Sequence, residues 1–260
     1  MNLNLDKKYA LVCGSTAGIG KATAMLLAEE GAIVTLIARN ENKLKAVLSS
    51  LPNPDLHDYI VADFANPDHL KDKLNAYIET KHGFHILVNN TGGPAGGPII
   101  SATLSAFESA FTQHLKCNHI LVQTLTPFMK TAGYGRIINV ISTSVKQPLD
   151  GLGVSNTIRG AVASWSKTLA NELGPFGITV NNVLPGATDT ERLSEIIKNK
   201  SDKSGLTEED TATAMKNAIP AKRFAKPEET AAAITFLASE QAAYINGVNL
   251  PVDGGRTKSL

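Results

Sequence analysis

Three glycines near the N-terminus have a spacing that suits the binding of phosphate groups. Gly14, Gly18 and Gly20 follow an apolar run over residues 10–13. Glycine permits a tight turn, a close backbone approach to a ligand and close packing of helix on strand, and the helix expected next presents free N–H groups. This GxxxGxG pattern predicts a pyrophosphate cradle, although ordinary glycine-rich turns share the composition. The other residues of the motif are Ser15, Thr16, Ala17 and Ile19.

A basic residue follows the second predicted strand. Arg39 stands where a dinucleotide-binding protein places the group that meets the adenine ribose. An acidic residue there would accept a bond from a ribose 2'-hydroxyl, whereas an arginine can bind a 2'-phosphate bidentately. The sequence therefore favours NADP(H) over NAD(H). The alternative is a solvated arginine at a helix start, since Ala17 adds no second cation to the glycine loop.

Short β-branched runs alternate with longer amphipathic stretches, which predicts the elements that position these motifs. Such regular alternation is typical of a parallel sheet covered by helices on both faces. We expect an α/β fold with a Rossmann-type doubly wound parallel sheet in a single domain over residues 1–260. Strands are expected near 8–13, 32–37, 57–62, 84–89, 135–141 and 177–183, and helices near 18–30, 40–50, 67–82, 104–131 and 154–174.

Composition excludes several classes of function. The chain has 260 residues, of which 43% are hydrophobic and 19% charged, so it can form a large core. The net charge is only +1, which makes nucleic acid or an anionic membrane an unexpected partner. No apolar run reaches the length of a membrane span or a signal peptide. Two cysteines without a CxxC spacing suit a reducing cytoplasm and argue against a cysteine zinc site.

Residues 191–210 are polar and contain the stretch Lys-Asn-Lys-Ser-Asp-Lys-Ser-Gly. Such an insertion is either a mobile flap or a passive surface excursion. Because it follows the sixth strand at the edge where α/β proteins bind ligands, we favour a substrate flap at about 188–220. Leu193, Ile196 and Ile197 either line this flap or pack a helix.

Several motifs, in order along nearly the whole chain, resemble those of the short-chain dehydrogenase/reductase family. They begin with the glycine loop and continue with Asn89-Asn90-Thr91-Gly92, residues 135–142, Pro185-Gly186 and Val252-Asp253-Gly254-Gly255. The resemblance implies cofactor contacts beyond the glycine loop and Arg39, and we expect no metal. These further contacts are Asp63, Asn90, Gly92, Arg159, Pro185, Gly186, Thr188 and Thr190.

The same resemblance implies catalytic positions at Ser142 and Asn118, but two positions depart from the family pattern. The family places a Tyr thirteen residues after the Ser and a Lys four residues later, where this chain has Ser155 and Arg159. The Tyr donates a proton to the carbonyl oxygen, and the Lys lowers its pKa. Ser155 is a much weaker acid, while Arg159 keeps a fixed charge that can hold the nicotinamide ribose. We therefore expect slow turnover by the usual mechanism.

Other residues are candidates for the missing proton donor. Lys146 and Asp150 lie between Ser142 and Ser155, and His114 precedes Asn118 by one helical turn. Each also has an ordinary interpretation, as a solvated charge or a packed histidine, and catalysis requires a geometry that the sequence does not show. His82 and His85 have no further ligand cluster, so they are not expected to bind a metal. Tyr9 and Tyr134 precede strands and so face the wrong edge of the sheet.

These observations favour an NADP(H)-dependent oxidoreductase acting on a carbonyl or secondary alcohol. By resemblance, the nearest described activity is reduction of a 3-oxoacyl thioester. Two alternatives stay open, namely a dinucleotide-binding sensor or partner protein with little catalysis, and a non-redox enzyme on the same fold. The resemblance also implies a homotetramer or homodimer.

Overall fold

Seven strands form one parallel sheet in this computed structural model, which describes residues 2–259. The strand order is β3-β2-β1-β4-β5-β6-β7, so the chain reverses direction across the sheet between β1 and β4. All neighbouring pairs are parallel. The strands are β1 (Tyr9–Cys13), β2 (Ile33–Ala38), β3 (Asp58–Val61), β4 (Ile86–Asn89), β5 (Gly135–Val140), β6 (Ile178–Pro185) and β7 (Asn249–Val252).

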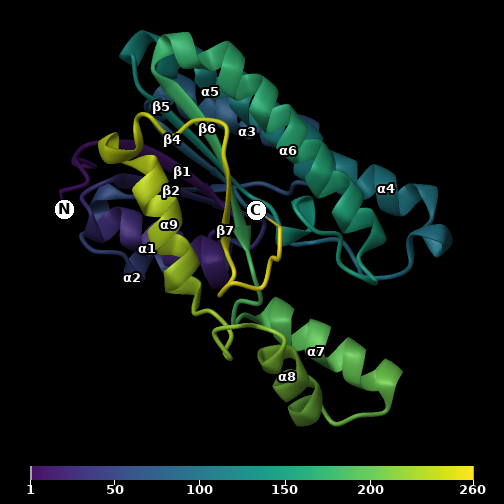
Figure 1. Cartoon of the computed structure of the whole chain (residues 1–260). Helices are drawn as coiled ribbons and strands as arrows, with labels where there is room; N and C mark the ends of the chain where they lie inside the picture. Colours follow the sequence, from purple (N-terminus) through teal and green to yellow (C-terminus); the bar gives the residue numbers. More distant parts are fainter. Residues whose placement is uncertain (1, 260) are drawn as a thin grey trace.

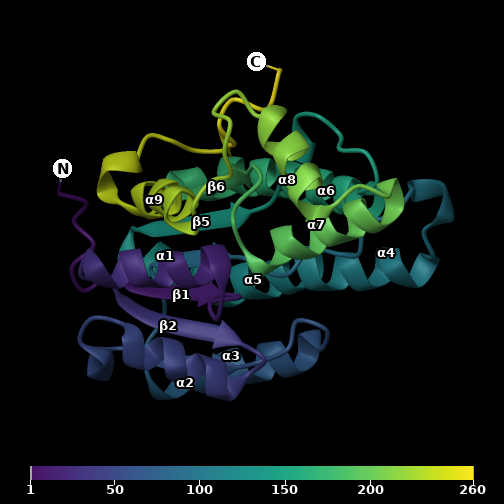
Figure 2. The same ribbon diagram turned by 90° about the horizontal axis from the view of Figure 1, so that it is seen from below.

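Helices cover both faces of this sheet (Figure 1). One apolar cluster joins one face to α1, α2 and α9, and a second joins the other face to α3, α5 and α6. Helices α7 and α8 lie side by side (Figure 2) and stand outside these layers (Figure 1). The α-helices are α1 (Gly18–Glu29), α2 (Glu41–Ser50), α3 (Pro67–Thr80), α4 (Leu104–Phe111), α5 (Cys117–Ala132), α6 (Gly153–Leu173), α7 (Glu191–Ser204), α8 (Glu208–Asn217) and α9 (Pro227–Ala238).

The apolar strands explain why two helix layers form. In β1, residues 10–13 are all fully buried, with alternate side chains in the two clusters. A strand pointing apolar side chains to both sides needs a cover on each. Each buried leucine or isoleucine contributes about 1.5–3 kcal/mol, so these clusters supply the main force that holds the sheet between its helices.

The predicted fold class is confirmed, and the six predicted strands are present. The structure differs from the predicted elements at three places. The single helix expected over 104–131 is divided by a π-helical turn at Thr112–Lys116. The polar insertion is helical, because α7 and α8 pack against each other. Strand β7 and helix α9 were not predicted; β7 contains Pro251 and is only partly buried, so it lacks the apolar pattern of a central strand.

A row of asparagine side chains crosses four strands in register. Asn89 Nδ2 donates to Asn139 Oδ1 over 2.8 Å, and Asn139 Nδ2 donates to Asn182 Oδ1 over 3.0 Å. Asn182 Nδ2 then donates to Asn249 Oδ1 over 2.8 Å. The first three residues are buried, so their amides depend on one another for hydrogen bonds.

No helix within residues 2–259 is long and apolar enough to cross a membrane.

Candidate functional site

The glycine loop lies between β1 and α1, next to the point where the strand order reverses. Gly14 and Gly18 have φ values of +57° and +51°, which a side chain would strain. A Cβ on Gly14 would lie 2.7 Å from the Asn90 carbonyl oxygen, and one on Gly18 would lie 2.9 Å from Thr190 Cγ2. These positions therefore require glycine, as a close backbone cradle does.

Gly20, which we expected among the cofactor contacts, is buried in the first turn of α1. A Cβ there would collide with the Gly14 carbonyl oxygen and would lie 2.7 Å from Asn90 Nδ2. The space beside the Gly20 Cα is therefore filled by the protein itself, and a cofactor contact of Gly20 stays a prediction. Gly20 lets the helix pack closely on the loop and on Asn90.

The first turn of α1 has the features of an anion site. Its N-cap residue is Ala17, which provides no side-chain cap, and the turn contains no acidic residue. The free N–H groups and the helix dipole thus have no acceptor from a capping side chain. This arrangement fits the pyrophosphate of a dinucleotide, since a phosphate at a helix N-terminus takes up those donors.

Two other segments adjoin this loop. Asn90 Nδ2 donates to the carbonyl oxygens of Cys13 and Gly14, both over 3.3 Å, which ties the end of β4 to the loop. Thr190 reaches the loop at Gly18. The structure thus brings together the glycine loop, Asn90 and Thr190, as expected for a cofactor site.

The remaining expected cofactor residues lie around these segments. Ser15 is fully buried and its hydroxyl points at the Ile37 carbonyl oxygen over 3.5 Å, so only its backbone can meet a ligand. Arg39 is exposed directly after β2 and has no ion pair among residues 2–259. Asp63 is half-buried after β3 and accepts a bond from Ala65 N. The other members are Thr16, Ile19, Gly92, Pro185 and Gly186, which are half-buried or exposed, and Thr188, which is buried.

The four expected catalytic residues come from three elements that pack together. Helix α6 contacts both the π-helical turn before Asn118 and the 3-10 turn at Thr143–Val145, which follows Ser142. Ser142 and Ser155 are half-buried, and Asn118 is buried. Ser142 Oγ accepts a hydrogen bond from Ser144 N over 3.1 Å, which keeps its proton free to donate elsewhere.

Arg159 is held against the end of β5. This residue is 8% exposed, and its Nη1 donates to the Val140 carbonyl oxygen over 2.9 Å. Nε is buried without an acceptor. Burial, and then the charge of Arg192, lower the pKa of Arg159 to about 10, so it stays charged near neutral pH. The site therefore contains a fixed cation with an unused donor.

His114 lies in the π-helical turn and is 2% exposed. Burial, followed by the charge of Arg159, lowers its pKa to about 2, although a backbone bond with Gly92 acts in the opposite direction. The ring is therefore neutral, and His114 does not fit the expectation of a protonated donor. Lys146 is half-buried and Asp150 is exposed, and neither forms an ion pair within residues 2–259.

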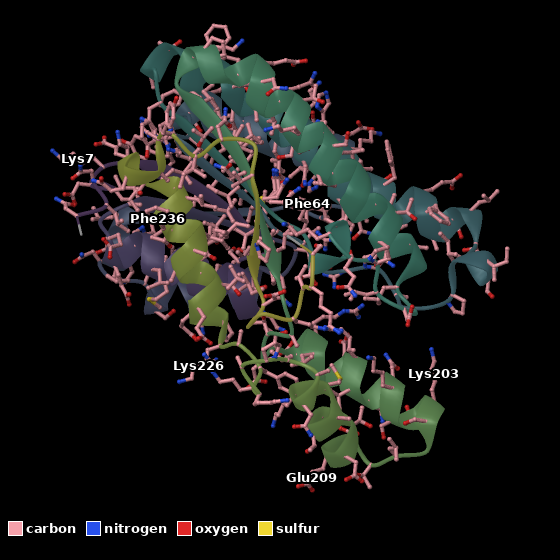
Figure 3. The ribbon with its side chains drawn as sticks, viewed as in Figure 1. Lys7, Phe64, Lys203, Glu209, Lys226 and Phe236 are labelled. Carbon is pink, nitrogen blue, oxygen red and sulfur yellow. The ribbon has the colours of Figure 1, made fainter. Side chains whose placement is uncertain are left out.

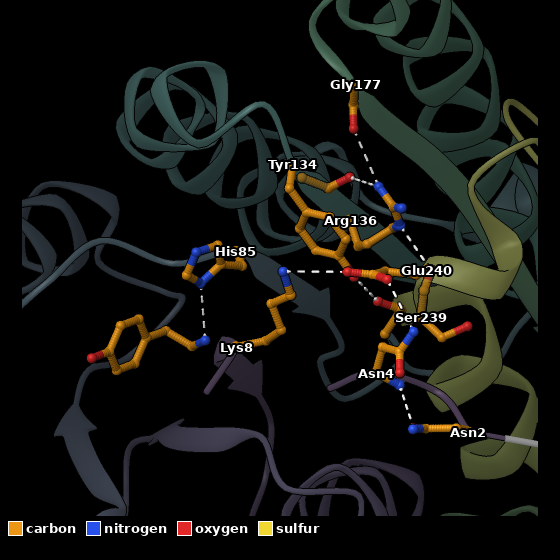
Figure 4. Close-up of polar contacts among 12 residues, drawn as sticks. Asn2, Asn4, Lys8, His85, Tyr134, Arg136, Gly177, Ser239 and Glu240 are labelled. Atoms are coloured by element: carbon orange, nitrogen blue, oxygen red, sulfur yellow. Dashed lines mark hydrogen bonds and ion pairs between the residues drawn. The ribbon is translucent and has the colours of Figure 1, made fainter. Parts of the chain in front are cut away.

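The other histidine and tyrosine candidates lie at the opposite, amino edge of the sheet. His82 stacks on Tyr9 with ring centroids 3.7 Å apart, and His85 Nδ1 accepts from Tyr9 N. The described residues contain no group of three side chains that could hold a metal. At this edge, Tyr134 Oη donates to the Ala238 carbonyl oxygen, and the neighbouring Arg136 is bonded to main-chain carbonyls (Figure 4).

Sequence reasoning missed one residue, Arg192, which links helix α7 to the loop after β4. Arg192, in α7, donates through Nη2 to the Pro94 carbonyl oxygen over 2.8 Å and pairs through Nη1 with Glu195 over 3.0 Å. It thus connects the insertion to the glycine- and proline-rich loop after β4. The contact joins residues 98 positions apart, so no local pattern indicates it.

Comparisons with known proteins agree with this arrangement. Residues 14–257 match the family model described as "Enoyl-(Acyl carrier protein) reductase". The chain is 29% identical to the NADPH-dependent reductase BacG of Bacillus subtilis, covering 98% of this chain and all of BacG. It is 33% identical to the 3-oxoacyl-[acyl-carrier-protein] reductase FabG of Vibrio cholerae, covering 97% and 98% of the two chains.

The chain is also similar to a solved structure over its whole length. The L-sorbose reductase of Gluconobacter frateurii, in complex with NADPH and L-sorbose, superposes with a TM-score of 0.93 at 31% identity, over the full length of both chains.

Proposed function

The chain belongs to the short-chain dehydrogenase/reductase family, and from this premise we propose that it is an NADPH-dependent oxidoreductase that reduces a carbonyl group or oxidises the corresponding alcohol. The observation that carries the proposal is the cradle, in which a glycine loop, an uncapped helix start and Asn90 meet. NADPH, when bound, supplies the hydride. The chain's own residues bind it, orient the substrate and stabilise the developing oxygen charge.

The choice of NADPH rests on Arg39. This cation is exposed and lacks an ion pair among the described residues, so a 2'-phosphate would meet a guanidinium that is free to bind it. BacG is named as an NADPH-dependent reductase and the sorbose reductase structure contains NADPH, which supports the same choice.

Replacing Arg39 provides the test of this choice. We expect Arg39→Ala to weaken NADPH binding by about tenfold or more, since a charge-assisted bond contributes about 1.5–3 kcal/mol, and to leave NADH nearly unchanged. Fluorescence titration of both nucleotides measures this. The control is Lys71→Ala, which removes an exposed cation from α3. Equal losses for NADPH and NADH would remove the assignment.

For the reaction itself, we infer that Ser142 and Asn118 orient the substrate oxygen and that Arg159 supplies fixed positive charge. Hydride adds to the carbonyl carbon, and the oxygen then takes a proton that originates from water. Ser155 can hydrogen-bond that oxygen, but its hydroxyl is a weak acid at neutral pH. Because general acid catalysis contributes about 10²- to 10⁴-fold, we expect turnover that is slow by comparison with a site containing a tyrosine.

The substrate class that the relatives suggest is a 3-oxoacyl thioester. We propose that α7 and α8 form the flap over it, because Arg192 connects α7 to the loop containing Pro94. The decisive experiment follows nicotinamide absorbance while a panel of 3-oxoacyl thioesters, ketoses and simple ketones is offered with NADPH. Steady oxidation of NADPH with one class supports the proposal, and tight NADPH binding without turnover of any class contradicts it.

One observation favours a second candidate, a dinucleotide-binding protein with little catalysis. Ser155 and Arg159 stand where the family pattern has its proton donor and lysine. If NADPH binds tightly but no carbonyl is reduced, this second candidate replaces the first.

We further propose that the protein assembles as a homotetramer or homodimer in the cytoplasm. Apolar side chains around α4 are exposed, with Ile100 at 93% and Leu104 at 81%, and a second copy would cover them. Light scattering of the purified protein tests the assembly, and a monomer would overturn it. Cys13 and Cys117 are free and buried, which suits a reducing compartment. Cell fractionation tests the location.

A further inference from the structure

A cavity of about 440 Å³ lies between α7, α8 and the C-terminal segment. Its size falls within the range of small-molecule sites, about 300–1,000 Å³. Apolar side chains make up much of its lining, including Leu206, Ala214, Met215 and Ala218. None of the residues proposed above for catalysis lines the cavity. Its lining includes Ala187, which lies in the chain between the expected cofactor residues Gly186 and Thr188.

The lining also contains three cations, Lys200, Lys203 and Arg256. None of them has an ion pair within residues 2–259. Arg256 is half-buried, whereas the two lysines are exposed and can turn toward a ligand. Lys203 lies near the end of α7 that is farther from the sheet, so the positive charge extends along the cavity (Figure 3). Among the described residues, no acidic side chain lines this cavity.

An independent observation concerns Thr211, which also lines the cavity. This residue is 6% exposed, and its Oγ1 is buried without a hydrogen-bond partner. A buried hydroxyl without a partner costs about 1–3 kcal/mol, which a ligand acceptor would offset. An apolar lining, three unpaired cations and an unpartnered hydroxyl together describe a site for an anion on an aliphatic chain.

We propose that this cavity binds an amphiphilic carboxylate, with the aliphatic chain against Leu206 and Met215 and the head group against the cations. Charge complementarity selects the anion, and the apolar lining selects the chain. None of the expected cofactor or catalytic residues lines the cavity, although it shares α7 and α8 with the proposed flap. Because binding is measured without nucleotide or turnover, its failure is distinguishable from a failure of the proposed carbonyl reduction.

Decanoate is the probe for this site, measured by calorimetry with the full-length protein in the absence of nucleotide. We expect saturable binding of decanoate, with decanol and acetate each at least about tenfold weaker because one lacks the charge and the other the chain. Lys200→Gln combined with Arg256→Gln should weaken decanoate by about tenfold or more. Thr211→Val keeps the side-chain shape and should also weaken it.

The matched control is Lys198→Gln, which removes an exposed lysine of α7 that does not line the cavity. It should leave decanoate binding unchanged. NADPH titration of each variant tests separately whether the cradle is intact. The proposal is overturned if decanoate does not saturate, if decanol binds equally well, if the control variant loses as much affinity, or if NADPH displaces decanoate competitively.

Discussion

Two buried arginines lie at opposite ends of β5 and differ in what surrounds them. At the amino end, Arg136 donates to the carbonyl oxygens of Ser239, Gly135 and Gly177, over 2.8–3.2 Å, and stacks over Tyr134. At the other end, Arg159 has a single hydrogen bond, to Val140, and a buried Nε without an acceptor. A guanidinium satisfied by main-chain carbonyls stabilises the fold, whereas one left partly unsatisfied is available to a ligand.

The largest expected effect comes from two substitutions at the carboxyl edge of the sheet. We expect Ser155→Tyr combined with Arg159→Lys to raise turnover of ketones by about 10²- to 10⁴-fold, because the pair restores a phenolic acid beside an amine. The absorbance of NADPH follows the rate, and Arg159→Lys alone is the control. If the double variant gains nothing while the native protein turns over well, another group donates the proton and Arg159 has a different role.

Exchanging each arginine for methionine compares the two edges directly. Arg136→Met removes a donor from the main-chain carbonyls of buried Ser239 and Gly135 and of exposed Gly177. We therefore expect the free energy of unfolding to fall by about 2–4 kcal/mol while the folded fraction binds NADPH normally. Arg159→Met should mainly weaken NADPH binding and turnover. Urea unfolding and nucleotide titration of both variants give the comparison. A reversed pattern would exchange the roles that we assign.

Two glycines with the same strained backbone provide a smaller test. Gly18, at the carboxyl edge, has φ +51°, and Gly133, before β5, has φ +60° with open space around its Cβ position. Alanine strains both backbones, but only Gly18→Ala crowds Thr190. We expect it to weaken NADPH by about tenfold, corresponding to about 1.4 kcal/mol, whereas Gly133→Ala retains affinity. Equal affinities in the two variants would argue against the cradle.

The last test concerns the pH dependence of stability that arises from His114. The pKa of His114 is lowered to about 2 in the folded protein. As the pH falls below about 6.5, His114 therefore takes up a proton in the unfolded chain but stays neutral in the folded one. Stability from this residue is therefore present above about pH 6.5 and is lost at up to about 1.4 kcal/mol per pH unit below it. Urea unfolding between about pH 7 and pH 4 should show a shallower slope for His114→Gln. Parallel slopes would mean that the ring is protonated in the fold.

The sequence allowed much of the carboxyl edge to be predicted, because its chemistry is local. The glycine loop and Asn90 lie within segments whose order follows from β-α alternation, and the structure joins them by direct contacts. The buried strand over residues 10–13 is confirmed, since a continuous apolar run needs a cover on both faces.

The parts that could not be predicted depend on tertiary contacts. The motif alone does not separate Gly20, which packs inside the protein, from the two glycines that form the cradle surface. Arg192 meets Pro94 across 98 residues, and the state of His114 arises from burial beside Arg159. The sequence left open whether Leu193, Ile196 and Ile197 pack a helix, and in the structure α7 forms and packs on α8. Whether Ser155 and Arg159 act as the resemblance implies stays a prediction.

The asparagine row has a consequence for how the chain folds. Its three amide bonds all require the same alignment of β4, β5, β6 and β7, because a slip of one residue would turn a side chain to the other face of the sheet. Apolar strands alone discriminate poorly between neighbouring alignments. The row therefore favours this one register of the four strands over registers shifted by one residue. A leucine in place of Asn139 would leave the Asn89 amide donor and the Asn182 amide acceptor without their partners, at a cost of about 1–3 kcal/mol for each buried group.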